Sequence, residues 1–276
     1  MDKSKLRKKS PLKKRPRRNA GDSTHNMILE ATDQLLPYWI MTIMLVLYAS
    51  LEFQDIPRLP LLWLAIATLF FILTTWKTLK AWPRIKAMKQ GRDGERRIGQ
   101  YLDNEFRDDL TGTPIRIFHD VPGENFNLDH VIICEKGIYV LETKTLSVPI
   151  KGLEKLFYKG GDHLYYKNNG ARVPGNPIGQ VKAGVKWLRE LLHRQYELEE
   201  KQFPKLPIRG VLVPADRFVH NDNIGEYDIW VLNQKAFAKF INNEKDRLSP
   251  ETVRSCGDLI AGYTRRKLDE ESKKLI

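Results

Sequence analysis

The chain of 276 residues contains only two cysteines, Cys134 and Cys256, one on an expected core strand and one on a late helix. This pair offers no disulfide framework and favours a reducing compartment. The sequence also lacks internal repeats, a glycine-rich phosphate-binding loop, a CxxC pair and a nucleophile elbow, and its six histidines show no spacing typical of a zinc site. These absences argue against a repeat protein, a P-loop enzyme and a serine hydrolase.

Two stretches lack charge altogether, residues 34–51 and 59–76, each 18 residues long. As helices they would each span about 27 Å, near the lower limit for crossing a bilayer. Trp39, Trp63 and Trp76 lie towards their ends, where interfacial aromatic residues are expected. We therefore expect residues 27–76 to form a transmembrane helical hairpin. A cleavable signal peptide is the alternative for the first stretch, but no A-x-A pattern closes it.

Acidic residues are scarce on both outer flanks of these stretches. Residues 1–18 hold ten Lys and Arg against one acid, and residues 77–92 hold six against none. The positive-inside rule then predicts a multi-pass protein of the cell inner membrane, with the N-terminus and the C-terminal domain both cytoplasmic. From residue 93 onward the chain has 29 basic and 28 acidic residues, so the net charge of +12 does not mark this domain as a nucleic-acid binder.

The first 26 residues have too little apolar surface to fold alone, and we expect a disordered basic arm there. This arm can bind nucleic acid or anionic lipid, or it can serve only as a topology signal. Residues 77–92 are expected to be a basic juxtamembrane linker, broken by Pro83 and able to rest on anionic headgroups.

The central feature of the remaining chain is an expected β-hairpin at residues 127–145, with its turn at Glu135-Lys136-Gly137. Alternation along the second strand puts Glu142 and Lys144 on one face. Folding the hairpin back brings Asp129 opposite or diagonal to Glu142, with Cβ atoms about 5–8 Å apart. Two carboxylates and an ammonium group would then meet at the end of an otherwise apolar hairpin.

Such a group suits a divalent metal site with a lysine beside it. Mg²⁺ and Mn²⁺ accept one or two protein carboxylates together with water and phosphate oxygens. The lysine can orient or deprotonate a water, or neutralise charge on a transferring phosphoryl group. The simpler alternative is a strand end with solvated charges, because D-x(12)-E-x-K is a loose pattern.

Two further polar residues lead helices that flank the hairpin. Glu95 shares a helical stripe with Ile98, Leu102 and Phe106, which predicts a core-facing carboxylate in need of a partner. Gln180 shares a face with Gly184, Trp187 and Leu191 and is likewise expected to face the core.

The order of these motifs resembles the nuclease-related domain (NERD) family of the PD-(D/E)XK nuclease superfamily, over residues 91–180 and onward to about residue 243. The motifs that carry the resemblance are G-R-D-G-E, N-L-D-H-V-I-I, G-I-Y-V-L-E-T-K-T and N-P-I-G-Q. It implies a nuclease dependent on Mg²⁺ or Mn²⁺ and acting on DNA. Where the family often has a tryptophan after the third strand, this chain has Leu156-Phe157-Tyr158.

The resemblance also implies roles for individual residues. Asp129 and Glu142 would be metal ligands, joined by the main-chain carbonyl of Thr143. Lys144 would be the activating or positioning lysine, with Glu95 and Gln180 as supporting catalytic residues. His130 matches a motif position without an agreed role.

The implied fold class is α/β, a restriction-endonuclease-like αβββαβ core with a mixed central sheet. Local patterns predict strands at 113–121, 209–214 and 227–232 and helices at 94–107, 177–198, 234–241 and 250–268, with short strands within 148–167. We expect a nuclease-like domain over residues 93–243 and a C-terminal helical extension over 244–276. The expected partners are nucleic acid, with DNA favoured, and membrane lipid, and the sequence does not indicate which proteins the chain binds.

A different class of function remains open. The chain can be a non-enzymatic, membrane-tethered module that binds nucleic acid or protein on a degenerate nuclease scaffold. Retention of all five polar positions favours the enzyme, while the nearly neutral domain favours weak or partner-dependent substrate binding.

Overall fold

The computed structural model describes residues 18–52, 59–106, 114–146, 155–196, 206–215, 217–221 and 227–274. The chain divides into two compact units, one of Asp22–Asp93 and the other of Met1–Gly21 with Gly94–Ile276. Each unit is described by itself.

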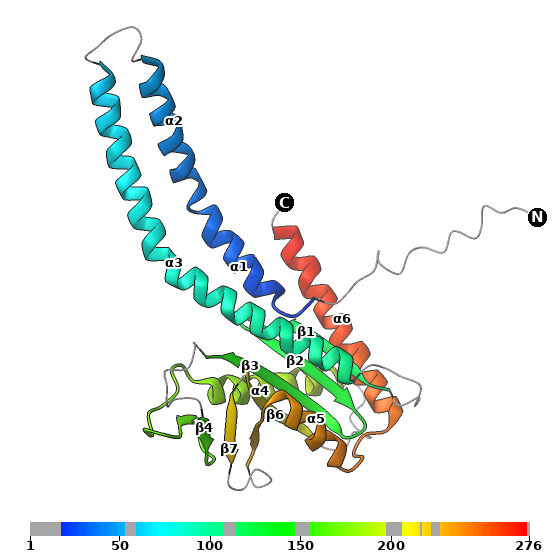
Figure 1. The fold of residues 1–276 in the computed structure, drawn as a ribbon. Helices are drawn as coiled ribbons and strands as arrows, with labels where there is room; N and C mark the ends of the chain where they lie inside the picture. The colour runs from blue at the N-terminus through cyan, green and yellow to red at the C-terminus, as the bar shows by residue number, and fades with distance from the viewer. Residues whose placement is uncertain are drawn as a thin grey trace, which may run out of the picture. The chain divides into compact units, whose positions relative to one another are not determined.

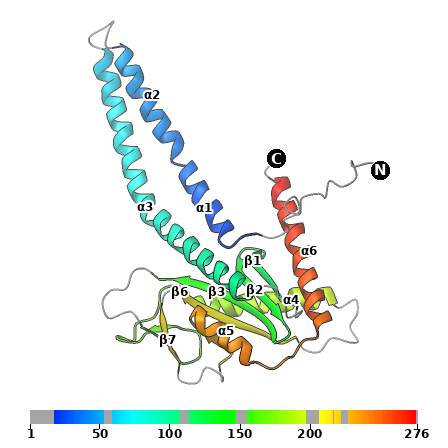
Figure 2. The same cartoon turned by 45° about the vertical axis from the view of Figure 1, so that its right-hand side comes forward.

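The unit Asp22–Asp93 is helical. It contains α1 (Asp22–Asp33), α2 (Leu36–Glu52) and the first part of α3 (Leu59–Glu105). The helices α2 and α3 run side by side in both views (Figures 1 and 2), and hydrogen bonds join Thr42 to Thr74 at 3.1 Å and Trp39 to Thr78 at 3.2 Å. Two helical spans, Asp22–Leu51 and Leu62–Glu105, are long and apolar enough to cross a membrane.

The helices of this unit differ from the sequence-based expectation in two places. The expected break at Pro83 is wrong, because α3 continues through it. The lost hydrogen bond at proline is tolerated there since Leu, Lys, Ala, Arg and Met, all good helix formers, surround it. The expected disordered arm is ordered from Arg18, and α1 begins at Asp22. Residues 1–17 and the expected turn at 53–58 lie outside the described residues.

The second unit is built on a five-stranded sheet. Its strands are β1 (Arg116–Pro122), β2 (Asn127–Cys134), β3 (Gly137–Thr145), β6 (Ile208–Ala215) and β8 (Ile229–Val231), in the spatial order β1-β2-β3-β6-β8. The first three strands are antiparallel neighbours, and β3, β6 and β8 are parallel. The expected mixed α/β architecture with a mixed central sheet is therefore confirmed.

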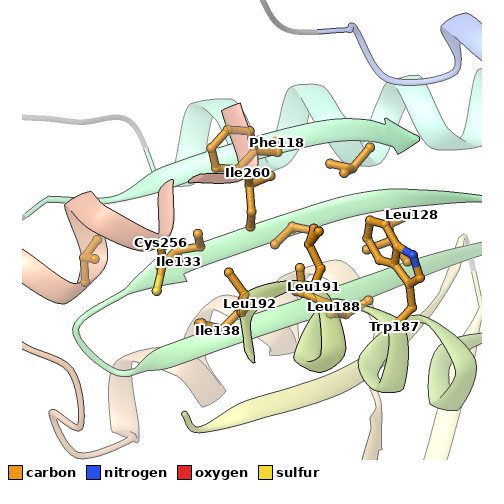
Figure 3. Close-up of a cluster of buried hydrophobic side chains, with 14 of the residues drawn as sticks. Phe118, Leu128, Ile133, Ile138, Trp187, Leu188, Leu191, Leu192, Cys256 and Ile260 are labelled. Atoms are coloured by element: carbon orange, nitrogen blue, oxygen red, sulfur yellow. The ribbon is translucent and has the colours of Figure 1, made fainter. Parts of the chain in front are cut away.

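Helices cover both faces of this sheet. Figure 3 shows side chains of α4 (Pro177–Tyr196) and α6 (Pro250–Lys274) meeting Ile133 and Ile138 on one face. On the other face the end of α3 and α5 (Gln234–Asn243) pack over Tyr139 and Leu141. Burying each such aliphatic side chain stabilises the unit by about 1.5–3 kcal/mol before chain entropy is counted. Since α6 supplies Cys256 and Ile260 to this core, residues 244–276 are an integral part of the unit and not an extension.

A second, three-stranded sheet stands beside the first. It consists of β5 (Tyr165–Tyr166), β4 (Lys155–Tyr158) and β7 (Phe218–Asn221), in that order. Its inner side chains, Leu156 and Tyr158, pack with Ile178 and Val181 of α4. The sequence did not predict β7. Residues 107–113, 147–154, 197–205, 216 and 222–226 lie outside the described part of this unit.

Candidate metal centre

The β2–β3 hairpin sets two carboxylates against each other. Its turn is closed by Gly137, whose φ of +148° is a conformation that favours glycine. His130 pairs with Leu141 at the open end of the hairpin, and Asp129 and Glu142 are the next residues on the two strands. The two carboxylates are near enough for Glu142 to raise the pKa of Asp129.

The backbone of β3 holds one of the two carboxylates directly. Asp129 Oδ2 accepts the N–H of Thr143 at 2.7 Å. This bond fixes the Asp129 side chain against the end of β3. Both Asp129 and Glu142 keep partial exposure, so an ion and its waters can reach them.

The surroundings of both carboxylates disfavour negative charge. Burial, Glu142 and Glu95 together raise the pKa of Asp129 well above its usual value, against the opposing effect of the Thr143 N–H. Burial also raises the pKa of Glu142 to about 7, with Glu95 adding to the rise and Lys144 opposing it. A divalent cation between the two groups would remove this penalty, because an opposite charge favours the ionised form.

Lys144 and Glu95 lie beside the pair, as the sequence predicted. Lys144 is near enough to Glu142 to lower the pKa of that carboxyl. The Nζ atom of Lys144 lies next to Gly175, because a Cβ added to this glycine would be 3.5 Å from Nζ. Glu95 is half-buried on α3, and its negative charge raises the pKa of both Asp129 and Glu142. Its neighbour Gly94 packs so closely that a Cβ there would overlap the hydroxyl of Thr145.

Gln180 differs from the expectation. It lies in the first turn of α4 and is exposed, so its predicted core-facing position is wrong. The stripe becomes buried only at Gly184, which packs on Leu128 and Val140. The residue that follows Val140 on the same face of β3 is Glu142, and its carboxylate is not an apolar surface that a helix side chain would bury. Within the described residues, no hydrogen bond joins its side chain to the carboxylates.

The structure adds a fourth carboxylate that sequence reasoning missed. Asp120 is buried, has the unusual φ of +50°, and contributes to the raised pKa of Asp129. Arg18 lies 3.6 Å from Asp120 Oδ2 and also pairs with Glu271. Arg18 therefore supplies a positive charge to the acidic cluster from the end of the basic arm, which nothing in its local sequence indicated.

A chain of polar side chains runs from the exposed Asp103 through the partly buried His119 to the buried His130 and Thr143. Asp103 Oδ1 lies 3.0 Å from His119 Nε2, the two Nδ1 atoms of His119 and His130 lie 2.8 Å apart, and His130 Nε2 lies 3.3 Å from Thr143 Oγ1. Because a carboxylate only accepts, His119 donates to Asp103 and accepts from His130, and the Thr143 hydroxyl donates to His130. Burial, with His119 as a smaller cause, keeps the pKa of His130 well below its usual value, consistent with a neutral ring. The chain anchors Thr143, the residue whose N–H holds Asp129.

The donor set fits a hard divalent cation that keeps most of its water. Among the described residues no group of three or more His, Cys, Asp or Glu side chains is arranged to hold a metal by itself. Mg²⁺ does not need one, since it is commonly held by one or two carboxylates, with water and phosphate oxygens completing its shell. The carboxylates of Asp129 and Glu142 meet that requirement.

Comparison with known proteins gives one match. The family model described as "Nuclease-related domain" (NERD) matches residues 90–215, which span the end of α3, the β1–β3 meander, α4 and β6. No curated protein and no solved structure matches the chain significantly. The match supports the resemblance seen in the motifs and indicates a nuclease-related function for this region.

Proposed function

We propose that this protein is a membrane-anchored nuclease, dependent on Mg²⁺ or Mn²⁺, that hydrolyses phosphodiester bonds of DNA at a D-x(12)-E-x-K site. The observation that carries the proposal is the closeness of Asp129 and Glu142, which follow the last hairpin pair His130–Leu141, with Lys144 and Glu95 close enough to shift the pKa of Glu142. The element order α3, β1, β2, β3, α4, β6 supports the αβββαβ core of restriction-endonuclease-like proteins.

Each residue has a distinct task in this proposal. Asp129 and Glu142 would hold the ion together with the main-chain carbonyl of Thr143, and the bond from the Thr143 N–H to Oδ2 keeps the Asp129 carboxylate at this end of β3. The ion, when bound, supplies positive charge that lowers the pKa of water and stabilises the developing phosphoryl charge. Lys144 orients the attacking water or donates to a non-bridging phosphate oxygen. Water forms the new P–O bond, and the scissile P–O ester bond breaks to leave a phosphomonoester and a hydroxyl.

The supporting residues act around this centre. Glu95 adds negative charge beside Asp129 and Glu142, which makes binding of a cation more favourable. Its carboxylate can also accept a hydrogen bond from the attacking water. Gln180 would contact substrate and not the ion, a role that its exposure at the start of α4 supports.

The membrane anchor is proposed from the two apolar helical spans and their basic flanks. Large apolar side chains are exposed along both helices, including Ile40 (51%), Met44 (60%) and Ile72 (57%), as suits contact with lipid. We place both chain ends in the cytoplasm and the anchor in the inner membrane, by the positive-inside rule.

The test uses the full chain in detergent and measures two quantities, Mn²⁺ binding by calorimetry and cleavage of plasmid and single-stranded DNA. Asp129→Ala and Glu142→Ala should lose both, whereas Lys144→Ala should bind the ion and lose cleavage. Asp258→Ala, an exposed carboxylate on α6, is the matched control and should behave as wild type. If wild type binds no divalent ion even with DNA present, or if all variants cleave equally, the tethered binding module replaces the nuclease.

A further inference from the structure

The outer face of the three-stranded sheet is a separate surface from the proposed metal centre. Along β4, Leu156 and Tyr158 are buried in the core, so Lys155 and Phe157 point the opposite way. On β7, Phe218 and His220 pair with Lys155 and Phe157, and therefore share this outer face. Figure 1 shows β4 and β7 side by side in the small sheet.

Three rings form a row across this face. Phe157 pairs with Tyr165 on β5 and with His220 on β7, and the rings of Phe157 and His220 are stacked at 5.9 Å and 29°. Beside the row, the side chain of Phe218 is 72% exposed. Of the described residues from Gly94 onward, only Phe218 and Phe126 are large apolar side chains left exposed. A ring this exposed buries little of its surface against the part of the chain that the structure describes.

Positive charge surrounds the rings. Continuing the β4–β5 register puts Lys167 opposite Lys155, and Arg172 forms a bridge with Tyr165, so all three cationic residues share the outer face. Lys159 Nζ lies 5.9 Å from the Tyr165 ring centroid. None of the three strands contains Asp or Glu. This local excess contrasts with the nearly equal charges of the whole domain.

The ring face begins close to the metal centre. Thr145, one residue after Lys144, pairs with Ala215 at the end of β6. Phe218 follows Ala215 by three residues, so its Cα lies within about 11 Å of the Cα of Ala215. Phe218 is therefore the end of the ring face that lies nearest in the chain to the strand pair β3–β6, whose β3 strand carries Glu142 and Lys144.

We propose that this face, defined by Lys155, Phe157, Tyr165, Lys167, Phe218 and His220 and called here the stacking face, binds single-stranded nucleic acid. Two or three bases stack on its rings, and the lysines contact the phosphates, as in other single-strand binding surfaces. The inference rests on the proposed nuclease and deepens it, because it assigns a single-stranded substrate or a single-stranded end to the same site. The tryptophan expected after the third strand is thus replaced by Phe157 and its neighbours.

The test measures binding in EDTA, where no metal chemistry operates, with the full chain in detergent. The probes are a fluorescently labelled oligothymidylate of about 20 nucleotides and a labelled abasic strand of the same length. Binding of each probe is followed by fluorescence anisotropy. Wild type should prefer the oligothymidylate, and Phe218→Ala should weaken that binding by about 5- to 100-fold without changing the abasic affinity. Phe218→Trp should keep the affinity, while Phe218→Leu should lose it, because leucine is apolar but has no ring face.

A charge control separates stacking from phosphate contact. Lys155→Ala should weaken both probes and reduce the log–log salt slope by about 0.7. Lys186→Ala on α4, another exposed lysine, should leave the slope unchanged.

Other outcomes overturn the inference. If Phe218→Leu binds the oligothymidylate like wild type, the Phe218 ring does not stack on bases. If wild type does not distinguish the two probes, bases are not recognised. Cleavage of the same oligonucleotide with Mg²⁺ is scored separately, so single-strand binding without cleavage refutes the nuclease alone, and cleavage without base-dependent binding refutes the stacking face alone.

Discussion

Replacing Glu142 by Gln tests whether burial and nearby negative charge make the ionised carboxylate of Glu142 unfavourable in the absence of a cation. In the folded chain, burial and Glu95 raise the pKa of Glu142 from 4.5 to about 7. A carboxyl whose pKa is higher in the folded than in the unfolded state binds its proton more tightly when folded. The proton that Glu142 binds more tightly in the folded chain therefore adds to the free energy of unfolding below about pH 4.5. This contribution is lost as the pH rises through about 7.

The size of the effect follows from the same values. Each pKa unit corresponds to about 1.4 kcal/mol, so the rise from 4.5 to about 7 gives about 3 kcal/mol, or about 1–3 kcal/mol after allowing for partial exposure. Glutamine carries no charge at any of these pH values, so the variant does not lose this stability as the pH rises. At pH 8 in EDTA, Glu142→Gln should therefore be more stable than wild type by about 1–3 kcal/mol, and near pH 4.5 the difference should vanish.

The assay is urea unfolding in EDTA at several pH values, followed by tryptophan fluorescence of the detergent-solubilised chain. Saturating Mg²⁺ at pH 8 should then reverse the order. A ligand at 100 times its Kd stabilises by about 2.7 kcal/mol, and the variant lacks one of the two carboxylates that we propose as ligands. Asp258→Asn serves as the control for loss of an exposed charge. A difference between wild type and Glu142→Gln that stays constant from pH 4.5 to 8 would refute the reasoning.

Three further outcomes are expected. His130→Ala should cost about 1–3 kcal/mol of unfolding free energy, since two buried polar partners lose their hydrogen bonds. Gly94→Ala should destabilise the chain by about 1–3 kcal/mol in thermal unfolding, because its Cβ would overlap Thr145, whereas Gly262→Ala, with open space around it, should stabilise by up to about 1 kcal/mol. A cytoplasmic reporter fused to the C-terminus should be active and one inserted at Asp55 inactive, and the chain should resist carbonate extraction from membranes; the reverse reporter pattern would contradict the topology.

The hairpin and its carboxylates could be predicted because their signals are local. Two apolar runs around a glycine turn set the ladder, and alternation then assigned Glu142 and Lys144 to one face. The stripe of Glu95 with Ile98 and Leu102 was equally local, and both apolar residues are buried as expected.

The features that sequence reasoning missed depend on contacts between distant segments. The pairing of His119 with His130 exists only once β1 and β2 are in register. The strand β7 has four residues and pairs with β4 some 60 residues earlier, so no local pattern marks it. Gln180 was misplaced for the opposite reason. Helical periodicity correctly put Gln180 on the same stripe of α4 as Gly184 and Trp187. It could not show that the apolar surface of the sheet under α4 ends before it reaches Gln180.

The two-residue turn of the β2–β3 hairpin also limits how this site can change by insertion or deletion. Adding one residue to each strand lengthens the spacing between Asp129 and Glu142 by two and leaves the two side chains opposite each other. Adding a single residue moves one strand's side chains to the other face, unless a bulge absorbs it. Working versions of this hairpin should therefore carry spacings that differ from the present twelve by even numbers, with odd spacings restricted to chains that have acquired a bulge.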